Sequence, residues 1–297
     1  MYLAVKQMRN YLEANMKKLL ETNLKENIKE LICQWIDHKE EGNISKPISD
    51  ELMKALDEYH DPNPKIMQLI ESLKQRKDYL TKRSHWIIGG DGWAYDIGFG
   101  GLDQVMSSGE DINVLVFDTE VYSNTGGQAS KSTPTGAIAK FASSGKKSAK
   151  KDLGLMMMTY GNVYVAQVGI HADNAQFMKA VMEAENYKGP SLIIAYAPCI
   201  SHGIKEGMGR SMETIQKAVR AGYWHLYRYN PQLRDEGKNP FILDSKEPTE
   251  SFRDFLMGQV RYSSLAKLYP DQAEELFLKA EKNSKERYQR YKNLSLS

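Results

Sequence analysis

The chain has 297 residues, of which 41% are hydrophobic, and its 40 basic and 38 acidic side chains leave a formal net charge of +2. This length can bury a sizeable core, and so small a charge gives no reason to expect nucleic acid or an acidic surface as a partner. No apolar run approaches a membrane span, no secretion signal is visible, and the two cysteines are far apart; we expect a cytoplasmic protein without a self-contained zinc or iron–sulfur site.

A helical arm is predicted for residues 1–80. Between residues 2 and 38, apolar side chains recur among charged ones at spacings of three, four and seven, which is typical of amphipathic helices. Cys33 lies on or beside an apolar face of this pattern and is expected to be a core thiol. We assign no chemistry to the arm.

Two further helices are predicted in the arm. After a break at residues 40–43, a helix is expected to begin near Ser49, with Ser49 or Asp50 as its N-cap. Pro64 follows a turn and is expected to open the next helix, which would run to about Tyr79.

A strand, a glycine turn, a helix and a second strand follow the arm. The apolar run at residues 86–88 leads into Gly-Asp-Gly at residues 90–92, and a small-residue helix is expected over 93–106. The second apolar run, at residues 114–117, ends in a polar loop over 118–128. Because parallel strands end at one edge of a sheet, we expect the turn and the loop side by side, where open α/β sheets bind ligands.

The two loops carry the oxygen atoms that Mg²⁺ prefers. Asp91 brings a carboxylate to the amino end of a helix, where backbone N–H groups favour an anion. A magnesium ion between this carboxylate and a phosphate is our interpretation, because Mg²⁺ is usually held by one or two protein groups, phosphate oxygens and water. The second loop offers the Thr119 hydroxyl, the Val121 carbonyl and the Asn124 amide. The glycines at 126–127 let the backbone approach a ligand.

Two simpler interpretations compete with a cofactor site. A lone Gly-Asp-Gly is usually only a turn. A dinucleotide-binding fingerprint is excluded, because Tyr95 stands where that motif needs glycine or alanine. The register of both strands, the helix and the second loop favours a cofactor site over a bare turn.

The segments GDGWAYDIGFGGLDQV and DTEVYSNTGGQ resemble thiamine diphosphate enzymes. Their sequences are similar to the thiamine-binding domain at the carboxyl end of the single-chain pyruvate:ferredoxin (flavodoxin) oxidoreductases. At the position of Thr119 many thiamine enzymes have asparagine, whereas these oxidoreductases have threonine. The resemblance implies Mg²⁺ held by Asp91, Thr119 and the Val121 carbonyl. It implies thiamine diphosphate bound by residues of both loops, namely Gly90, Asp91, Gly92, Trp93, Thr119, Glu120, Val121, Tyr122, Ser123 and Asn124. No side chain is assigned a catalytic role, because the cofactor carries the chemistry.

A small, polar and basic segment at residues 129–151 follows and ends in four lysines within residues 146–151. A solvated loop is one explanation. A docking patch for an acidic carrier such as ferredoxin, or for coenzyme A phosphates, is the other, because basic clusters steer anionic partners.

Strands and helices alternate through the rest of an α/β domain predicted for residues 81–245, and a helical tail is predicted for 246–297. The expected elements are a methionine-rich helix around 156–158, strands at 163–168, 191–197, 223–229 and 241–244, and helices at 173–187 and 211–221. The alternation predicts a doubly wound, mostly parallel sheet. Pro270 is expected in the first turn of the final helix.

Cys199 follows a predicted strand and is expected at the same edge of the sheet as Asp91. A lone cysteine is most often a small buried side chain. In the family that the chain resembles, a cysteine in a Tyr-x-Pro-Cys setting is the fourth ligand of a 4Fe–4S cluster. Such a cluster needs four thiolates, so the resemblance implies that Cys199 ligates one only together with cysteines upstream of the arm. His202 lies in a glycine-rich segment and is assigned no role.

The resemblance spans nearly the whole chain and implies part of an enzyme that converts pyruvate to acetyl-CoA and CO₂. Electrons would pass through 4Fe–4S clusters to ferredoxin or flavodoxin. The fragment is expected to be inactive without the substrate- and pyrimidine-binding and iron–sulfur domains of a homodimeric enzyme. Two alternatives stay open: a thiamine-dependent 2-oxo acid decarboxylase or synthase without redox centres, and a non-catalytic assembly fragment.

Overall fold

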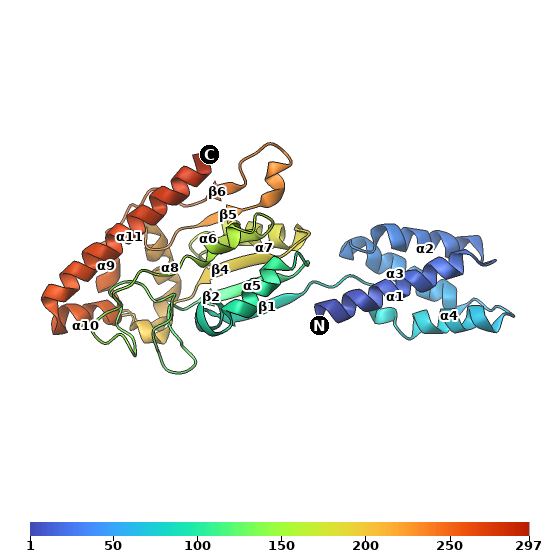
Figure 1. Cartoon of the computed structure of the whole chain (residues 1–297), viewed down its shortest axis with the longest axis horizontal. Coiled ribbons are helices and arrows are strands. Elements are labelled where there is room, and N and C mark those ends of the chain that lie inside the picture. The colour runs from blue at the N-terminus through green and yellow to red at the C-terminus, as the bar shows by residue number, and fades with distance from the viewer. Residues whose placement is uncertain (297) are drawn as a thin grey trace. The chain divides into compact units, whose positions relative to one another are not determined.

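Helices make up the beginning of the chain in the computed structural model, which describes residues 1–296 (Figure 1). They are α1 (Tyr2–Leu20), α2 (Glu26–His38), α3 (Gly42–Asp57) and α4 (Pro64–Lys74), followed by the short 3₁₀ helix η1 (Lys77–Tyr79). Together they form a compact unit, Met1–His85, with a hydrophobic core of its own. The helical character predicted for this part of the chain is confirmed.

The third helix begins seven residues earlier than predicted. It starts at Gly42, so the predicted start near Ser49, with Ser49 or Asp50 as N-cap, is wrong. Ser49 is buried inside the helix, where its hydroxyl donates to the Ser45 carbonyl at 2.5 Å. Pro47 also lies within the helix. Packing of the helix against the core therefore outweighs the local signals of a break.

Cys33 is exposed, so the prediction of a core thiol is wrong. The buried residues of α2 are Ile28, Ile32 and Trp35. Successive residues of a helix are rotated by about 100°, and this rotation carries Cys33 from the position of Ile32 toward solvent.

The fourth helix, α4, begins at Pro64 as predicted but ends at Lys74 rather than near residue 79.

A six-stranded sheet organises the second compact unit, Trp86–Ser297. Its strands are β1 (Trp86–Gly90), β2 (Asn113–Asp118), β3 (Tyr164–Val168), β4 (Ser191–Tyr196), β5 (Tyr227–Tyr229) and β6 (Phe241–Leu243). The order is β1-β2-β4-β3-β5-β6; the first four strands are parallel and the last two antiparallel. The predicted α/β fold with a mostly parallel sheet is confirmed.

The helix predicted over residues 93–106 is two helices. A π-helix, η2 (Gly92–Ile97), comes first, and α5 (Phe99–Ser107) follows. The Gly98 N–H donates to the Trp93 carbonyl at 2.8 Å, a wide turn that separates the two. The remaining elements are α6 (Leu153–Met158), α7 (Asn174–Asn186), η3 (Ile200–His202), η4 (Met208–Arg210), α8 (Ser211–Arg220), η5 (Pro231–Arg234), α9 (Phe252–Met257), α10 (Val260–Leu268) and α11 (Pro270–Leu296).

Both faces of the sheet are covered, as parallel sheets require. Alternate residues of β3 show this: Val165 belongs to the larger core, and Tyr164 and Ala166 to a smaller core that includes residues of α7. Phe277 and Tyr291 of α11 also belong to the larger core. The three-part division at residues 80 and 245 stays a prediction, since the chain separates once, after His85. Among residues 1–296, no helix is long and apolar enough to cross a membrane.

Candidate functional site

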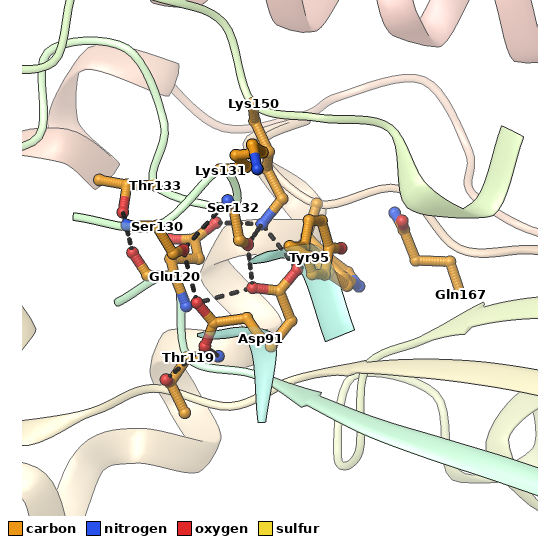
Figure 2. A network of polar contacts seen from close by, with 12 residues as sticks. Asp91, Tyr95, Thr119, Glu120, Ser130, Lys131, Ser132, Thr133, Lys150 and Gln167 are labelled. Carbon is orange, nitrogen blue, oxygen red and sulfur yellow. Dashed lines mark hydrogen bonds and ion pairs between the residues drawn. The ribbon is translucent and has the colours of Figure 1, made fainter. Parts of the chain in front are cut away.

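The Gly-Asp-Gly turn and the second loop meet at the ends of β1 and β2. These strands are parallel, and Gly90 is in register with Phe117, so Asp91 emerges beside Asp118. Figure 2 shows Asp91 next to Thr119. The Thr119 N–H donates to Asp91 Oδ1 at 3.1 Å. Thr119 Oγ1 lies 2.8 Å from Asp91 Oδ1 and 3.0 Å from the Val121 carbonyl oxygen. The structure therefore brings together the three groups predicted to hold Mg²⁺.

The spacing of these oxygens fits a small cation. Octahedral Mg²⁺ holds its ligands at about 2.1 Å, which places neighbouring ligand oxygens about 3 Å apart. The Thr119 hydroxyl is at that separation from both Asp91 and Val121. One carboxylate, one hydroxyl and one carbonyl are also the hard oxygen donors that Mg²⁺ selects. The residues present thus fit the ion that the resemblance implies.

Asp91 is nearly inaccessible to solvent, with 1% of its surface exposed. Its second oxygen, Oδ2, accepts a hydrogen bond from the Ser130 hydroxyl at 2.6 Å. Burial, and then the negative charge of Asp118, raise the pKa of Asp91 to about 6. A cation bound to this carboxylate would favour its charged form.

Aromatic rings lie over the glycines of the turn. A methyl group added to Gly92 would come 2.6 Å from Cδ1 of Tyr122, and one added to Gly98 would come 2.1 Å from Cδ1 of Trp93. Gly90 is different: the nearest atom to such a methyl is the Phe117 carbonyl oxygen at 3.9 Å. Gly92 and Gly98 are therefore needed for packing, and Gly90 leaves open space.

The predicted cofactor contacts of the second loop separate into an inner and an outer group. Ser123 and Asn124 are exposed, beside a turn in which the Gly127 N–H donates to the Tyr122 carbonyl at 2.9 Å. Glu120 instead turns its side chain into the interior. Its carboxylate therefore does not share the exposed tip, and the contact of Glu120 with the cofactor stays a prediction.

Glu120 is held by buried charges. Its carboxylate accepts hydrogen bonds from Arg261 Nη2 at 2.6 Å, from the Tyr223 hydroxyl at 2.6 Å and from Lys150 Nζ at 3.0 Å. Burial alone would raise the pKa of Glu120, but the charges of Lys150 and Arg261 outweigh burial and lower that pKa to about 2. Glu120 is therefore a permanent internal anion.

The lysine cluster is largely internal, so the expectation of a solvated loop is wrong for three of its members. Lys150 Nζ lies 2.8 Å from Asp118 Oδ2, with 7% of its side chain exposed. Lys146 donates to the carbonyls of residues 130 and 133, both at 2.7 Å, and Lys151 donates to the Tyr95 carbonyl at 3.1 Å. Lys147 is exposed. A docking patch, if formed, rests on that side chain and its exposed neighbours and stays a prediction.

Cys199 lies just beyond β4, whose last residue, Tyr196, is in register with Asp118 of β2. The cysteine is half-buried, and its sulfur accepts a hydrogen bond from the Ser201 N–H at 3.5 Å. Within residues 1–296, no three His, Cys, Asp or Glu side chains gather in a way that would hold a metal. A cluster at Cys199 would therefore need ligands from elsewhere.

His202 is one of the residues of this site that sequence reasoning missed. It is fully buried, and its Nε2–H donates to the Thr119 carbonyl at 2.6 Å. Burial, together with the charge of Arg261, lowers the pKa of His202 to about 3, so the ring is neutral. A histidine among loop glycines carries no periodic signal, and only its place next to β4 could have suggested a contact with the second loop.

Comparison with known proteins identifies relatives across the whole chain. Residues 73–195, which include both loops, match the family "Thiamine pyrophosphate enzyme, C-terminal TPP binding domain". The chain is 55% identical over 296 residues to the pyruvate:ferredoxin oxidoreductase of Moorella thermoacetica, with 99% of this chain and 25% of the relative covered. It is 52% identical over 295 residues to the pyruvate-flavodoxin oxidoreductase of Klebsiella pneumoniae, with the same shares covered.

The chain is homologous to one part of the pyruvate:ferredoxin (flavodoxin) oxidoreductases. It spans about a quarter of the length of these relatives. A solved 2-oxoglutarate:ferredoxin oxidoreductase from Magnetococcus marinus is 23% identical, with 38% of this chain and 40% of that chain covered and a TM-score of 0.36. The resemblance to the pyruvate:ferredoxin (flavodoxin) oxidoreductases, first seen in the two loop motifs, is thus confirmed.

Proposed function

We propose that the chain is the part of a pyruvate:ferredoxin (flavodoxin) oxidoreductase that binds thiamine diphosphate and Mg²⁺. The observation that carries the proposal is the meeting of Asp91, Thr119 and Val121 oxygens at two adjacent strand ends. Identity above one half to relatives of that name over 99% of the chain supports it. Asp91, Thr119 and Val121 would hold the ion.

The residues around the ion would position the cofactor. Gly90 and the aromatic rings on either side of the turn would line one wall, and the exposed Ser123 and Asn124 would reach its polar groups. Bound thiamine diphosphate supplies the carbanion-stabilising chemistry that decarboxylation of a 2-oxo acid requires. The buried site keeps the Asp91 carboxylate away from bulk water, which strengthens its attraction for a cation.

The complete enzyme would be a cytoplasmic homodimer that converts pyruvate to acetyl-CoA and CO₂. Cys199 would be the fourth ligand of a 4Fe–4S cluster whose other cysteines come from the remaining domains. Electrons would leave for ferredoxin or flavodoxin. This part of the proposal rests on the relatives and on the position of Cys199 beside the second loop.

Thermal unfolding of the 297-residue chain tests the cofactor site. A ligand that binds only the folded state stabilises it, by about 2.7 kcal/mol at one hundred times its Kd. Thiamine diphosphate with Mg²⁺ is expected to raise the Tm of the wild type and to leave that of Asp91→Ala unchanged. Asp96→Ala is the matched control, because this nearby carboxylate binds Lys131 instead of the loop and should keep the response. Equal responses of wild type and Asp91→Ala would contradict the proposal.

A further inference from the structure

Glu120 occupies a strained position between two of the proposed cation ligands. Its φ is 58°, in the left-handed region that residues other than glycine rarely adopt. This conformation directs the Glu120 side chain inward, while the Thr119 hydroxyl lies between Asp91 and the Val121 carbonyl oxygen. The direction taken by Glu120 therefore decides where those two oxygens lie.

The inward direction is held by cations. Glu120 and Arg261 are both 1% exposed in their side chains, and their ion pair is 2.6 Å long. An unpaired carboxylate at that depth would be strongly unfavourable. Lys150 also contacts Glu120, but it is shared with Asp118. Arg261 is thus the counterion directed at Glu120.

Arg261 is itself fixed within the fold. Its Nε donates to Gln259 Oε1 at 2.8 Å, and its Nη2 donates to the Tyr223 hydroxyl at 3.0 Å. Its carbonyl accepts a hydrogen bond from the Ile138 N–H at 3.0 Å. A guanidinium held at Nε and Nη2 can transmit its position to the carboxylate that it binds.

The junction between α9 and α10 also reaches Thr119 by a second path. The Val260 N–H donates to the Gly203 carbonyl at 2.8 Å, next to His202, which donates to the Thr119 carbonyl. Both paths start within residues 259–261 and end at the same loop. The carboxyl-terminal helices are thereby connected to the cation ligands.

We propose that Arg261, in the first turn of α10, is a positioning residue that fixes the cation loop (residues 118–122) through Glu120. The inference rests on the proposed cation site. It adds that a residue outside the two loops holds that site in place. Residues that orient metal ligands cost about ten- to a hundredfold in metal affinity when they are replaced. Replacing Arg261 is expected to weaken cation binding within that range.

Binding of Mn²⁺ to the 297-residue chain with thiamine diphosphate, followed by the electron paramagnetic resonance signal of free Mn²⁺, tests the proposal. Arg261→Met should weaken binding by about ten- to a hundredfold. Arg261→Lys, which keeps the charge, should restore part of it. Adding Glu120→Gln to Arg261→Met should also recover affinity, because it removes the buried carboxylate that has lost its arginine and keeps only the shared Lys150.

Arg228→Met is the matched control. Arg228 is also buried, although its partners Glu183 and Asp244 are more exposed than Glu120, and it pairs with them away from the loop, so its loss also removes an internal ion pair. It should lower stability without changing Mn²⁺ affinity. An equal loss of affinity in Arg228→Met would show a general effect of instability and overturn the proposal.

The outcomes separate this inference from the cation site itself. If wild type and Asp91→Ala retain Mn²⁺ equally poorly, the cation site is wrong and this inference falls with it. If wild type binds and Arg261→Met binds equally well, only the role of Arg261 is wrong. If Arg261→Met does not fold, Arg261→Lys decides in the same assay: an affinity weaker than that of the wild type supports the role of Arg261, and wild-type affinity overturns it.

Discussion

Gly92 has no side chain because the ring of Tyr122 occupies the place of one. The turn is therefore shaped by two requirements: it leaves Asp91 free to face Thr119, and it makes room for an aromatic ring from the neighbouring loop. The second requirement joins the two loops by packing as well as by hydrogen bonds. A side chain at position 92 should consequently disturb the packing of both loops.

Gly92→Ala is expected to destabilise the second unit by about 1–3 kcal/mol, the usual cost of overpacking. The added methyl would lie 2.6 Å from the Tyr122 ring. Urea unfolding measures this loss. The double variant Gly92→Ala/Tyr122→Ala should lose less unfolding free energy than the two single variants lose in sum. Gly100→Ala is the control, since nothing lies within 4 Å of its added methyl in α5; it should leave stability unchanged or slightly raised. A Gly92→Ala variant as stable as Gly100→Ala would contradict the packing role.

Asp91 and Thr119 could be paired from the sequence because each follows an apolar run, and parallel strands end at one edge. Glu120 and Arg261 could not, since 141 residues separate them and no periodic pattern joins them. His202 and Lys150 were missed for the same reason: their partners become neighbours only through the sheet order. Short-range motifs therefore predicted the oxygens of the site, and long-range pairing supplies what holds them.

Apolar runs predicted the central strands and the limits of α7 and α8 to within about one residue, but not those of α3, α4 and β5. β5 is short because the aromatic run at residues 223–226 enters the core instead of the ladder; Trp224 Nε1–H, for example, donates to the Val168 carbonyl at 2.9 Å. α3 begins early, and its first turns already face inward: Ser45 and Ser49 are buried there. Tertiary packing determined both lengths, and such packing cannot be read from the neighbouring residues in the sequence.

Pro47 makes α3 less stable than its length suggests. Proline in a helix interior lacks an N–H and crowds the preceding turn, at a cost of about 3 kcal/mol. Pro47→Ala is expected to stabilise the first unit by about 1–3 kcal/mol, part of the gain being offset by the freer unfolded chain. Urea unfolding followed by the fluorescence of Trp35, which is buried in that unit, would measure it. A loss of stability would show that proline is accommodated there without strain.

At the scale of the whole molecule, buried histidines make the second unit sensitive to acid. Burial, and then the charge of Arg287, lower the pKa of His225 to about 3. Its pKa in the unfolded chain is about 6.5. Between these values the unfolded chain binds the proton and the folded one does not. The contribution of His225 to stability is therefore present above pH 6.5 and is lost as the pH falls toward 3.

The unfolding free energy should fall by about 1.4 kcal/mol per pH unit for each such histidine in this range. His225→Gln is expected to make the fall shallower, because it removes one proton bound on unfolding. Urea unfolding from pH 7.5 to pH 5 measures the slope. His60→Gln, an exposed position in the first unit, is the control and should leave the slope of the second unit as it is. Parallel slopes for wild type and His225→Gln would exclude a neutral buried ring.

The ion pair between Glu120 and Arg261 has a consequence for the nascent chain during translation. A ribosome adds about 5–20 residues per second, so Arg261, 141 residues after Glu120, is made roughly 7 to 28 s later. During that interval the β1–β2 end of the growing chain has both loops but lacks the arginine that turns Glu120 inward. Translation must therefore reach α10 before the loop at residues 118–122 can be held by this ion pair in the conformation seen here.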